Sequence, residues 1–241
     1  MRPGLALALR AAGGLAALAV LAGALGYGWD ALARRPIAEV RFTGDLARVN
    51  PADLERLAAG LRGREARAVA LADVREAVKR VAWVRECSVR RAFPATLVVA
   101  IEAHEPLARW DEARLVSARG EVFAADYEGE LPVFEGPEGT APEMARLWPR
   151  VGRAAAPLGS PVKALRLSAR RAWQATLASG LVIEMGRSDM EARLARFAAA
   201  WPQVAAEAAR ATRADLRYPG GFALRGVAPP ERKAAPGGKR A

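Results

Sequence analysis

An uncharged run of nineteen residues near the N-terminus constrains this chain more than any other feature. The run extends from Ala11 to Trp29 and reads AAGGLAALAVLAGALGYGW. At about 1.5 Å rise per residue, a helix of this length spans nearly the whole hydrocarbon layer of a bilayer. Tyr27 and Trp29 stand at its C-terminal end, where aromatic rings favour the membrane interface. We therefore predict a transmembrane helix over residues 11–29, preceded by a short segment at residues 1–10.

A cleaved signal peptide is the alternative interpretation of this segment. The tripeptide at residues 31–33, Ala-Leu-Ala, has the small-x-small pattern of a cleavage site. The apolar part of a signal peptide usually spans about 7 to 15 residues, which is shorter than this run. Arginines on both sides leave the orientation open, because a long following domain is translocated largely regardless of charge. The length favours an uncleaved anchor and does not fix its topology.

The residue inventory disfavours most catalytic and metal chemistry. The 241 residues include one cysteine and one histidine, which exclude an internal disulfide and a histidine-rich metal site. His104 and Glu105 resemble the start of a zincin helix, but the second histidine of that motif is absent, since position 108 is Ala. The sequence contains no Walker-type phosphate loop and no G-x-S-x-G motif. We expect no enzyme activity, no cofactor and no bound metal, and we expect the lone Cys87 to be a buried structural residue.

The strong positive charge raises the question of nucleic-acid binding. Lys and Arg number 37 against 26 Asp and Glu, which gives a formal net charge of +11. The arginine pairs at 34–35, 90–91 and 170–171 fall in different predicted elements and are separated by acidic residues. A nucleic-acid reader instead gathers its cations on one face or helix. We therefore predict a solvated arginine-rich surface, with no nucleic acid and no small-molecule substrate as a partner.

Residues 37–105 predict a small α+β module. Residues 37–43 have the pattern of a strand, and Asn50 followed by Pro51 is typical of a helix start. A second helix is predicted at residues 72–81, from the spacing of its valines. Strands are predicted at residues 84–90 and 96–102. The order β-α-α-β-β predicts both helices on one face of one sheet.

Residues 106–226 predict a second domain of mixed β structure with flanking helices. A Pro/Gly-rich stretch at residues 131–137 is expected to lead into a helix around Met144 and Leu147, and a second amphipathic helix is expected from Asp189 to about Ala209. The tail at residues 227–241 is basic and rich in Pro and Gly, which predicts disorder. The strands are predicted at residues 107–111, 114–117, 121–125, 162–168, 172–177, 181–185, 212–218 and 222–225.

Several short motifs follow the apolar run in a fixed order. The motifs are Ile37-Ala38-Glu39-Val40 with Gly44, Trp83-Val84, Val89-Arg90-Arg91 with Phe93-Pro94, Leu97-Val98-Val99, Glu102-His104-Glu105-Pro106, Trp110, Gly120-Glu121-Val122-Phe123, Leu131-Pro132 with Gly136-Pro137, Arg193-Leu194-Ala195-Arg196-Phe197 and Asp215-Leu216-Arg217-Tyr218. No single motif is specific, but their order and spacing over residues 1 to about 226 make the chain resemble one family, the bacterial cell division protein FtsQ and the related DivIB.

The resemblance implies a non-enzymatic scaffold of the division complex. It implies a POTRA domain at residues 37–105, a β domain at residues 106–226, a cytoplasmic N-terminus and a periplasmic bulk, at the septum of the inner membrane. The implied partners are FtsB and FtsL, bound through the β domain, with links to the septal synthases FtsW and FtsI. A secreted periplasmic chaperone or transport accessory with a POTRA domain is the alternative, and it requires cleavage after Ala33.

The last hairpin is the predicted partner site, since the resemblance places FtsB there. Leu216, Tyr218, Phe222 and Leu224 share a parity, so we expect them on one face of a C-terminal edge strand. An uncovered edge can accept an added strand. We also expect two arginines of the preceding helix to face outward toward the partner. The predicted site residues are Arg193, Arg196, Arg217, Tyr218, Gly220, Gly221, Phe222, Ala223, Leu224 and Arg225.

Overall fold

The computed structural model describes residues 16, 18–28, 35–208 and 210–226. The chain divides into two compact units, Met1–His104 and Glu105–Ala241. Residues 18–28 are helical, and among the described residues no helix is both long and apolar enough to cross a membrane. Residues 11–15, 17 and 29 of the predicted span lie outside the described residues, as do the predicted segment at residues 1–10 and the tail at residues 227–241.

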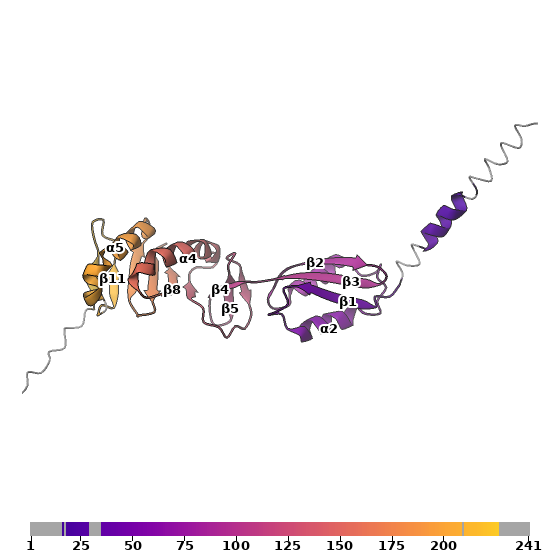
Figure 1. Cartoon of the computed structure of the whole chain (residues 1–241), viewed down its shortest axis with the longest axis horizontal. Coiled ribbons are helices and arrows are strands. Elements are labelled where there is room, and N and C mark those ends of the chain that lie inside the picture. The colour runs from indigo at the N-terminus through magenta and orange to yellow at the C-terminus, as the bar shows by residue number, and fades with distance from the viewer. Residues whose placement is uncertain (1–15, 17, 29–34, 209, 227–241) are drawn as a thin grey trace, which may run out of the picture. The chain divides into compact units, whose positions relative to one another are not determined.

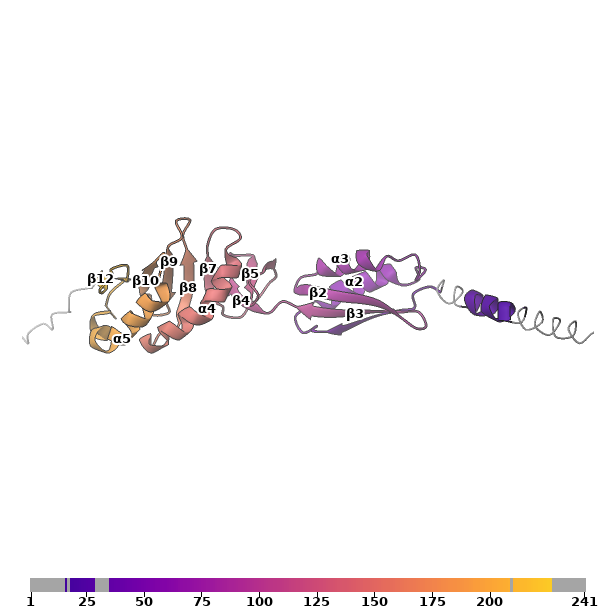
Figure 2. The ribbon, with the colours of Figure 1, turned by 90° about the horizontal axis from the view of Figure 1, so that it is seen from above.

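The first unit contains a three-stranded sheet with two helices on one face (Figures 1 and 2). The strands lie in the order β1-β3-β2, with β1 parallel and β2 antiparallel to the central β3. The predicted β-α-α-β-β order is therefore confirmed. The elements are β1 (Glu39–Gly44), α2 (Pro51–Leu61), α3 (Leu71–Lys79), β2 (Val84–Ala92) and β3 (Thr96–Ala103).

Local chemistry explains these elements. The Asn50 side chain accepts a hydrogen bond of 2.9 Å from the Ala52 N–H, and Pro51 occupies the first turn of α2, as the sequence predicts. Leu97, Val99 and Ile101 alternate along β3 and are buried beneath the helices. The helices thus cover the apolar face of the sheet, and this packing forms the core of the unit.

The second unit is built on a nine-stranded sheet in the order β12-β11-β10-β9-β8-β7-β4-β5-β6. Helices α4 (Ala141–Ala155) and α5 (Met190–Ala208) pack on it, and α5 continues through Pro202. The strands are β4 (Pro106–Arg109), β5 (Arg114–Ser117), β6 (Val122–Ala124), β7 (Val133–Glu135), β8 (Val162–Leu167), β9 (Trp173–Leu177), β10 (Val182–Gly186), β11 (Arg213–Asp215) and β12 (Ala223–Arg225).

Strand β7 corrects the sequence prediction, which expected only a Pro/Gly-rich approach to α4 at residues 131–137. All three residues of β7 pair in parallel with β8, and Val133 also pairs in parallel with Arg109 of β4. A parallel pair needs a long crossover, and α4 is the crossover between β7 and β8 just as α5 is between β10 and β11. The prediction was wrong because a three-residue strand has no measurable periodicity.

The core of the second unit lies between the sheet and the two helices. Phe134 from β7 and Phe197 from α5 are both fully buried. The Trp148 ring of α4 lies 5.3 Å from the Phe134 ring, centroid to centroid, and packs against the core as a partly buried side chain. Leu216, Phe222 and Leu224 pack against the same cluster, so the last hairpin is attached to the core through its apolar side chains.

Candidate partner-binding edge of the second unit

Strand β12 ends the nine-stranded sheet, and among the described residues no strand pairs with its outer side. Its inner side pairs antiparallel with β11, in the register Arg213 with Arg225, Ala214 with Leu224 and Asp215 with Ala223. The result is a short edge held by one hairpin.

The hydrogen-bond pattern determines which backbone groups of β12 point outward. The Val182 N–H donates to the Thr212 carbonyl and the Leu216 N–H to the Glu184 carbonyl, at 3.1 and 2.9 Å. Even-numbered residues of β11 therefore face β10, and odd-numbered residues face β12. Asp215 then forms the hydrogen-bonded pair with Ala223, and alternation directs the N–H and C=O of Leu224 away from the sheet.

The underside of this edge is apolar. The Phe222 ring lies 4.9 Å from the Phe197 ring, centroid to centroid, in an edge-on arrangement. Leu216 is buried, whereas Tyr218 is 48% exposed. The predicted shared face is therefore correct for Leu216, Phe222 and Leu224 and wrong for Tyr218.

Tyr218 lies off the apolar face because β11 is shorter than the predicted strand at residues 212–218. The Asp215 carboxylate accepts a hydrogen bond of 3.1 Å from the backbone N–H of Arg217, two residues on. Such a local side-chain contact competes with strand pairing and turns the chain. The alternation ends there, before it can bring Tyr218 onto the apolar face.

Asp215 is a buried carboxylate beneath a group of arginines. Its side chain is 3% exposed and accepts hydrogen bonds of 2.8 and 2.7 Å from the Arg217 guanidinium, with Arg225 at 4.0 Å. The hydrogen bonds from Arg217, more than the charge of Arg225, hold the pKa of Asp215 below its usual range. The same pairing raises the pKa of Arg217.

This carboxylate belongs to a polar row that crosses the exposed face of the sheet. Neighbouring strands place the members of the row opposite one another in register, and Arg213 adds an ion pair of 2.5 Å to Glu184. The face of the sheet away from the helices is therefore polar and charged, with Asp215 as its buried member. The row consists of Glu135, Arg166, Gln174, Glu184 and Asp215.

The two predicted arginines of α5 have different environments. Arg193 is half-buried, and its guanidinium donates a hydrogen bond of 3.0 Å to the Met185 carbonyl at the end of β10. The expectation that Arg193 faces outward is wrong, because Gly186 has a φ of +82° and leaves space that the Arg193 side chain occupies. Arg196 is exposed and donates a hydrogen bond of 3.0 Å to the Pro219 carbonyl, which connects α5 to the hairpin turn.

The remaining predicted residues lie in the hairpin turn and in β12. Arg217 and Arg225 both approach Asp215, on the face opposite Leu224, as their parity predicts. A Cβ atom at Gly220 or Gly221 would meet no atom within 4 Å. The sequence analysis did not select Asp215 or Gly186 for the site, although the Asp-x-Arg spacing at residues 215–217 is a signal for a same-face ion pair.

Other candidate sites have structural roles or none that the geometry supports. Among the described residues, no group of three or more Cys, His, Asp or Glu side chains could hold a metal ion. Cys87 is buried on β2, its thiol lies 3.6 Å from the Arg75 carbonyl of α3, and burial raises the pKa of that thiol. Cys87 is therefore buried, as the sequence predicts.

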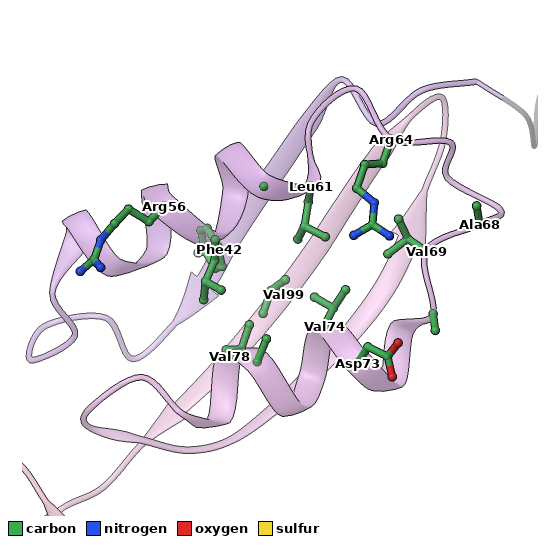
Figure 3. A pocket seen from close by; sticks show the side chains of 14 residues that line it. Phe42, Arg56, Leu61, Arg64, Ala68, Val69, Asp73, Val74, Val78 and Val99 are labelled. Atoms are coloured by element: carbon green, nitrogen blue, oxygen red, sulfur yellow. The ribbon is translucent and has the colours of Figure 1, made fainter.

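A hollow of about 350 Å³ lies between α2 and α3 in the first unit (Figure 3). Phe42, Val78 and Val99 are among its apolar lining residues, and Arg56 and Asp73 are among its charged ones. None of the predicted site residues lies in it.

Taken together, a β-α-α-β-β unit followed by a mixed sheet that ends, in the described part of the chain, at the unpaired side of β12 defines a POTRA-containing class of protein. Comparison with known families supports both halves: residues 35–104 match the FtsQ-type POTRA domain, and residues 108–217 match the C-terminal domain of cell division protein FtsQ/DivIB.

Several relatives extend over most of the chain. A cell division protein FtsQ from Burkholderia pseudomallei is 36% identical over 87% of this chain and 88% of its own length. One from Xanthomonas campestris is 35% identical over 82% of this chain and 72% of its own, and one from Bordetella pertussis is 40% identical over 65% of each. The chain belongs to the FtsQ/DivIB family of bacterial cell division proteins.

Proposed function

We propose that this chain is a membrane-anchored, non-enzymatic scaffold of the division complex that binds FtsB and FtsL through its second unit. Membership of the family supports a role in division, and the free edge at β12 supports the mode of binding. In this proposal the protein connects early and late division proteins at the septum, with FtsW and FtsI reached through the bound partners.

A strand of FtsB is added to β12, backbone to backbone. The outward N–H and C=O of Leu224 supply the first donor and acceptor, and the apolar contacts of Phe222 and Leu224 hold the edge in place before the partner arrives. A preformed edge lowers the entropic cost of binding, because only the partner strand becomes ordered.

Positive charge beside the edge selects the partner. Arg196 is exposed next to the turn, and Arg217 and Arg225 are each about 60% exposed although they share one carboxylate. Acidic side chains flanking the added strand satisfy these cations. Charge reversal at Arg196 is expected to weaken FtsB binding, with the larger effect at low salt, where exposed charges are less screened.

The proposed arrangement in the cell comprises a cytoplasmic segment at residues 1–10, an anchor at residues 11–29, a periplasmic POTRA domain at residues 37–105, a periplasmic β domain at residues 106–226 and a basic tail at residues 227–241. Protease added to spheroplasts is expected to degrade the two folded units. Their survival until the membrane is permeabilised would show that the topology is wrong.

The strand-addition mechanism is tested at one backbone atom. Leu224→Pro removes the outward N–H and the leucine side chain, whereas Leu224→Ala removes only the side chain. We expect Leu224→Ala to bind the periplasmic segment of FtsB with modestly reduced affinity and Leu224→Pro to lose roughly a further tenfold or more, the equivalent of about one lost hydrogen bond to a desolvated partner.

Circular dichroism and the unfolding midpoint of both variants provide the control for the fold. Equal affinities for Leu224→Pro and Leu224→Ala in folded proteins would mean that the partner docks elsewhere on the chain.

A further inference from the structure

Three segments of the first unit converge at one end of its sheet. The Ala38 N–H donates to the Ala95 carbonyl, and the Ile37 N–H donates to the Arg64 carbonyl, each at 2.9 Å. The Arg91 side chain crosses to the Ala66 carbonyl at 2.9 Å. The start of the domain at residues 35–38, the loop at residues 62–69 and the β2–β3 turn therefore lie together.

Phe93 stands at the tip of the β2–β3 turn and is 78% exposed. From residue 35 onward it is the most exposed of the large hydrophobic side chains in the described part of the chain, ahead of Tyr218 at 48%. Pro94 follows it and is also exposed. A ring this exposed at the end of a hairpin is accessible to a second surface, and burial of its apolar area there is favourable.

Arginines flank this tip on both faces of the sheet. Arg35, Arg64 and Arg90 are exposed, and within the described residues none of the three forms an ion pair. Arg64 lies in the loop on the helix side, where its exposed side chain lines the hollow between α2 and α3 (Figure 3). Arg90 is the cross-strand partner of Val98, on the face of the sheet away from the helices. The loop at residues 62–69 contains one acidic residue, Glu65, so positive charges outnumber negative charges around the tip.

Covalent geometry limits how far this end can lie from the proposed anchor. Gly28 and Arg35 are seven residues apart, and seven extended residues reach at most about 25 Å. The first described residues after this connection, residues 35–38, lie at the same end of the domain as the tip of the hairpin. Of the two ends of the domain, this end is the one tethered near the bilayer.

We propose that the β2–β3 hairpin is a second membrane contact, in which Phe93 enters the interfacial layer of an anionic bilayer and Arg35, Arg64 and Arg90 bind lipid phosphates. Aromatic rings favour the headgroup region, and basic residues near an anionic surface are attracted to it. The contact rests on the anchor in the proposed function. It holds the POTRA domain against the membrane and limits its rotation about the connecting segment.

The test uses the full chain reconstituted into vesicles of phosphatidylcholine with phosphatidylglycerol. In a Cys87→Ala background, Phe93→Cys carries an environment-sensitive nitrobenzoxadiazole label, and Ala82→Cys carries the same label at the opposite end of the domain. We expect a blue-shifted emission at residue 93 that is quenched by doxyl lipid, and a water-like, unquenched emission at residue 82. Vesicles of phosphatidylcholine alone or high salt should weaken the signal at residue 93.

The paired change Arg64→Glu and Arg90→Glu is a second test that leaves the core intact, because both side chains are exposed. It should lower the ratio of inserted to free hairpin by at least roughly 30-fold, since the loss of each arginine removes about a fivefold preference for the anionic surface and each glutamate adds repulsion.

Co-flotation of protein with the vesicles separates the possible failures. Protein that floats with residue 93 as water-exposed as residue 82 overturns the hairpin contact alone, and so does an unchanged signal in the arginine variant. Protein that does not float overturns the anchor as well. Neither result bears on FtsB binding at β12, which is measured with the Leu224 variants.

Discussion

Replacing Asp215 by Asn is expected to destabilise the second unit measurably at neutral pH. The change keeps the size of the side chain and one acceptor for the Arg217 N–H, but it removes the charge that receives two hydrogen bonds from the Arg217 guanidinium. It also leaves Arg213, Arg217 and Arg225 with Glu184 as the remaining carboxylate nearby.

The size of the stability loss on Asp215→Asn follows from these contacts. Hydrogen bonds to a charged group contribute about 1.5–3 kcal/mol each when buried, but the Arg217 end is 59% exposed and solvent screens it. We therefore expect a loss of about 1–2 kcal/mol, which corresponds to a decrease of roughly 3–8 °C in the unfolding temperature of a unit this size.

The stability difference between the wild type and Asp215→Asn should decrease as the pH falls. The pKa of Asp215 is lowered in the folded protein, so its contribution is complete above the unfolded value of about 3.9 and is lost as the pH falls through the folded pKa. The difference between the wild type and Asp215→Asn should therefore be full at pH 7 and narrow below about pH 4.

Urea unfolding followed by tryptophan emission provides the assay, since four of the six tryptophans belong to the second unit. Glu135→Gln is the matched control, because Glu135 lies in the same polar row but is exposed and should change stability by less than about 0.5 kcal/mol. Equal midpoints for wild type and Asp215→Asn at pH 7, or a gap that widens in acid, would refute the reasoning.

Three further predictions concern residues around the two cores. Cys87→Ala should retain partner binding, and the native thiol should resist alkylation at pH 8, because burial raises its pKa; rapid alkylation of folded protein would contradict this. Gly186→Ala should destabilise by about 1–3 kcal/mol in urea unfolding, because a Cβ at φ +82° would lie 2.5 Å from Arg193, whereas Gly60→Ala inside α2 should be neutral or stabilising. Arg193→Ala should lower the unfolding midpoint, because it leaves the Met185 carbonyl without its hydrogen bond, whereas Arg196→Ala should mainly weaken FtsB binding. An unchanged midpoint for Arg193→Ala with weakened FtsB binding would contradict the structural role of Arg193.

The sequence predicted the elements that have strong local signals. Asn50 and Pro51 marked the start of α2, and the alternation of Leu97, Val99 and Ile101 marked the buried face of β3. These predictions succeeded because the capping and periodicity that they used are local properties of the chain.

The remaining features depend on contacts between distant residues. Strand β7 forms because β4 and β8 pair with it on either side. No local sequence pattern in Val133–Glu135 predicts this pairing. Arg193 turned inward because Gly186, seven residues earlier, adopts a left-handed conformation that leaves it space. Tyr218 is not on the predicted apolar face, because the hydrogen bond between the Asp215 side chain and the Arg217 N–H turns the chain at Arg217.

Hydrogen exchange at the last strand tests the central proposal most directly. In the free protein the Leu224 amide points away from the sheet and should exchange quickly, while the Ala223 amide, which faces β11, should already be protected. On saturation with the periplasmic segment of FtsB, we predict that the Leu224 amide becomes strongly protected and that Ala223 changes little. A Leu224 amide that still exchanges at its free rate in the saturated complex would contradict strand addition at β12.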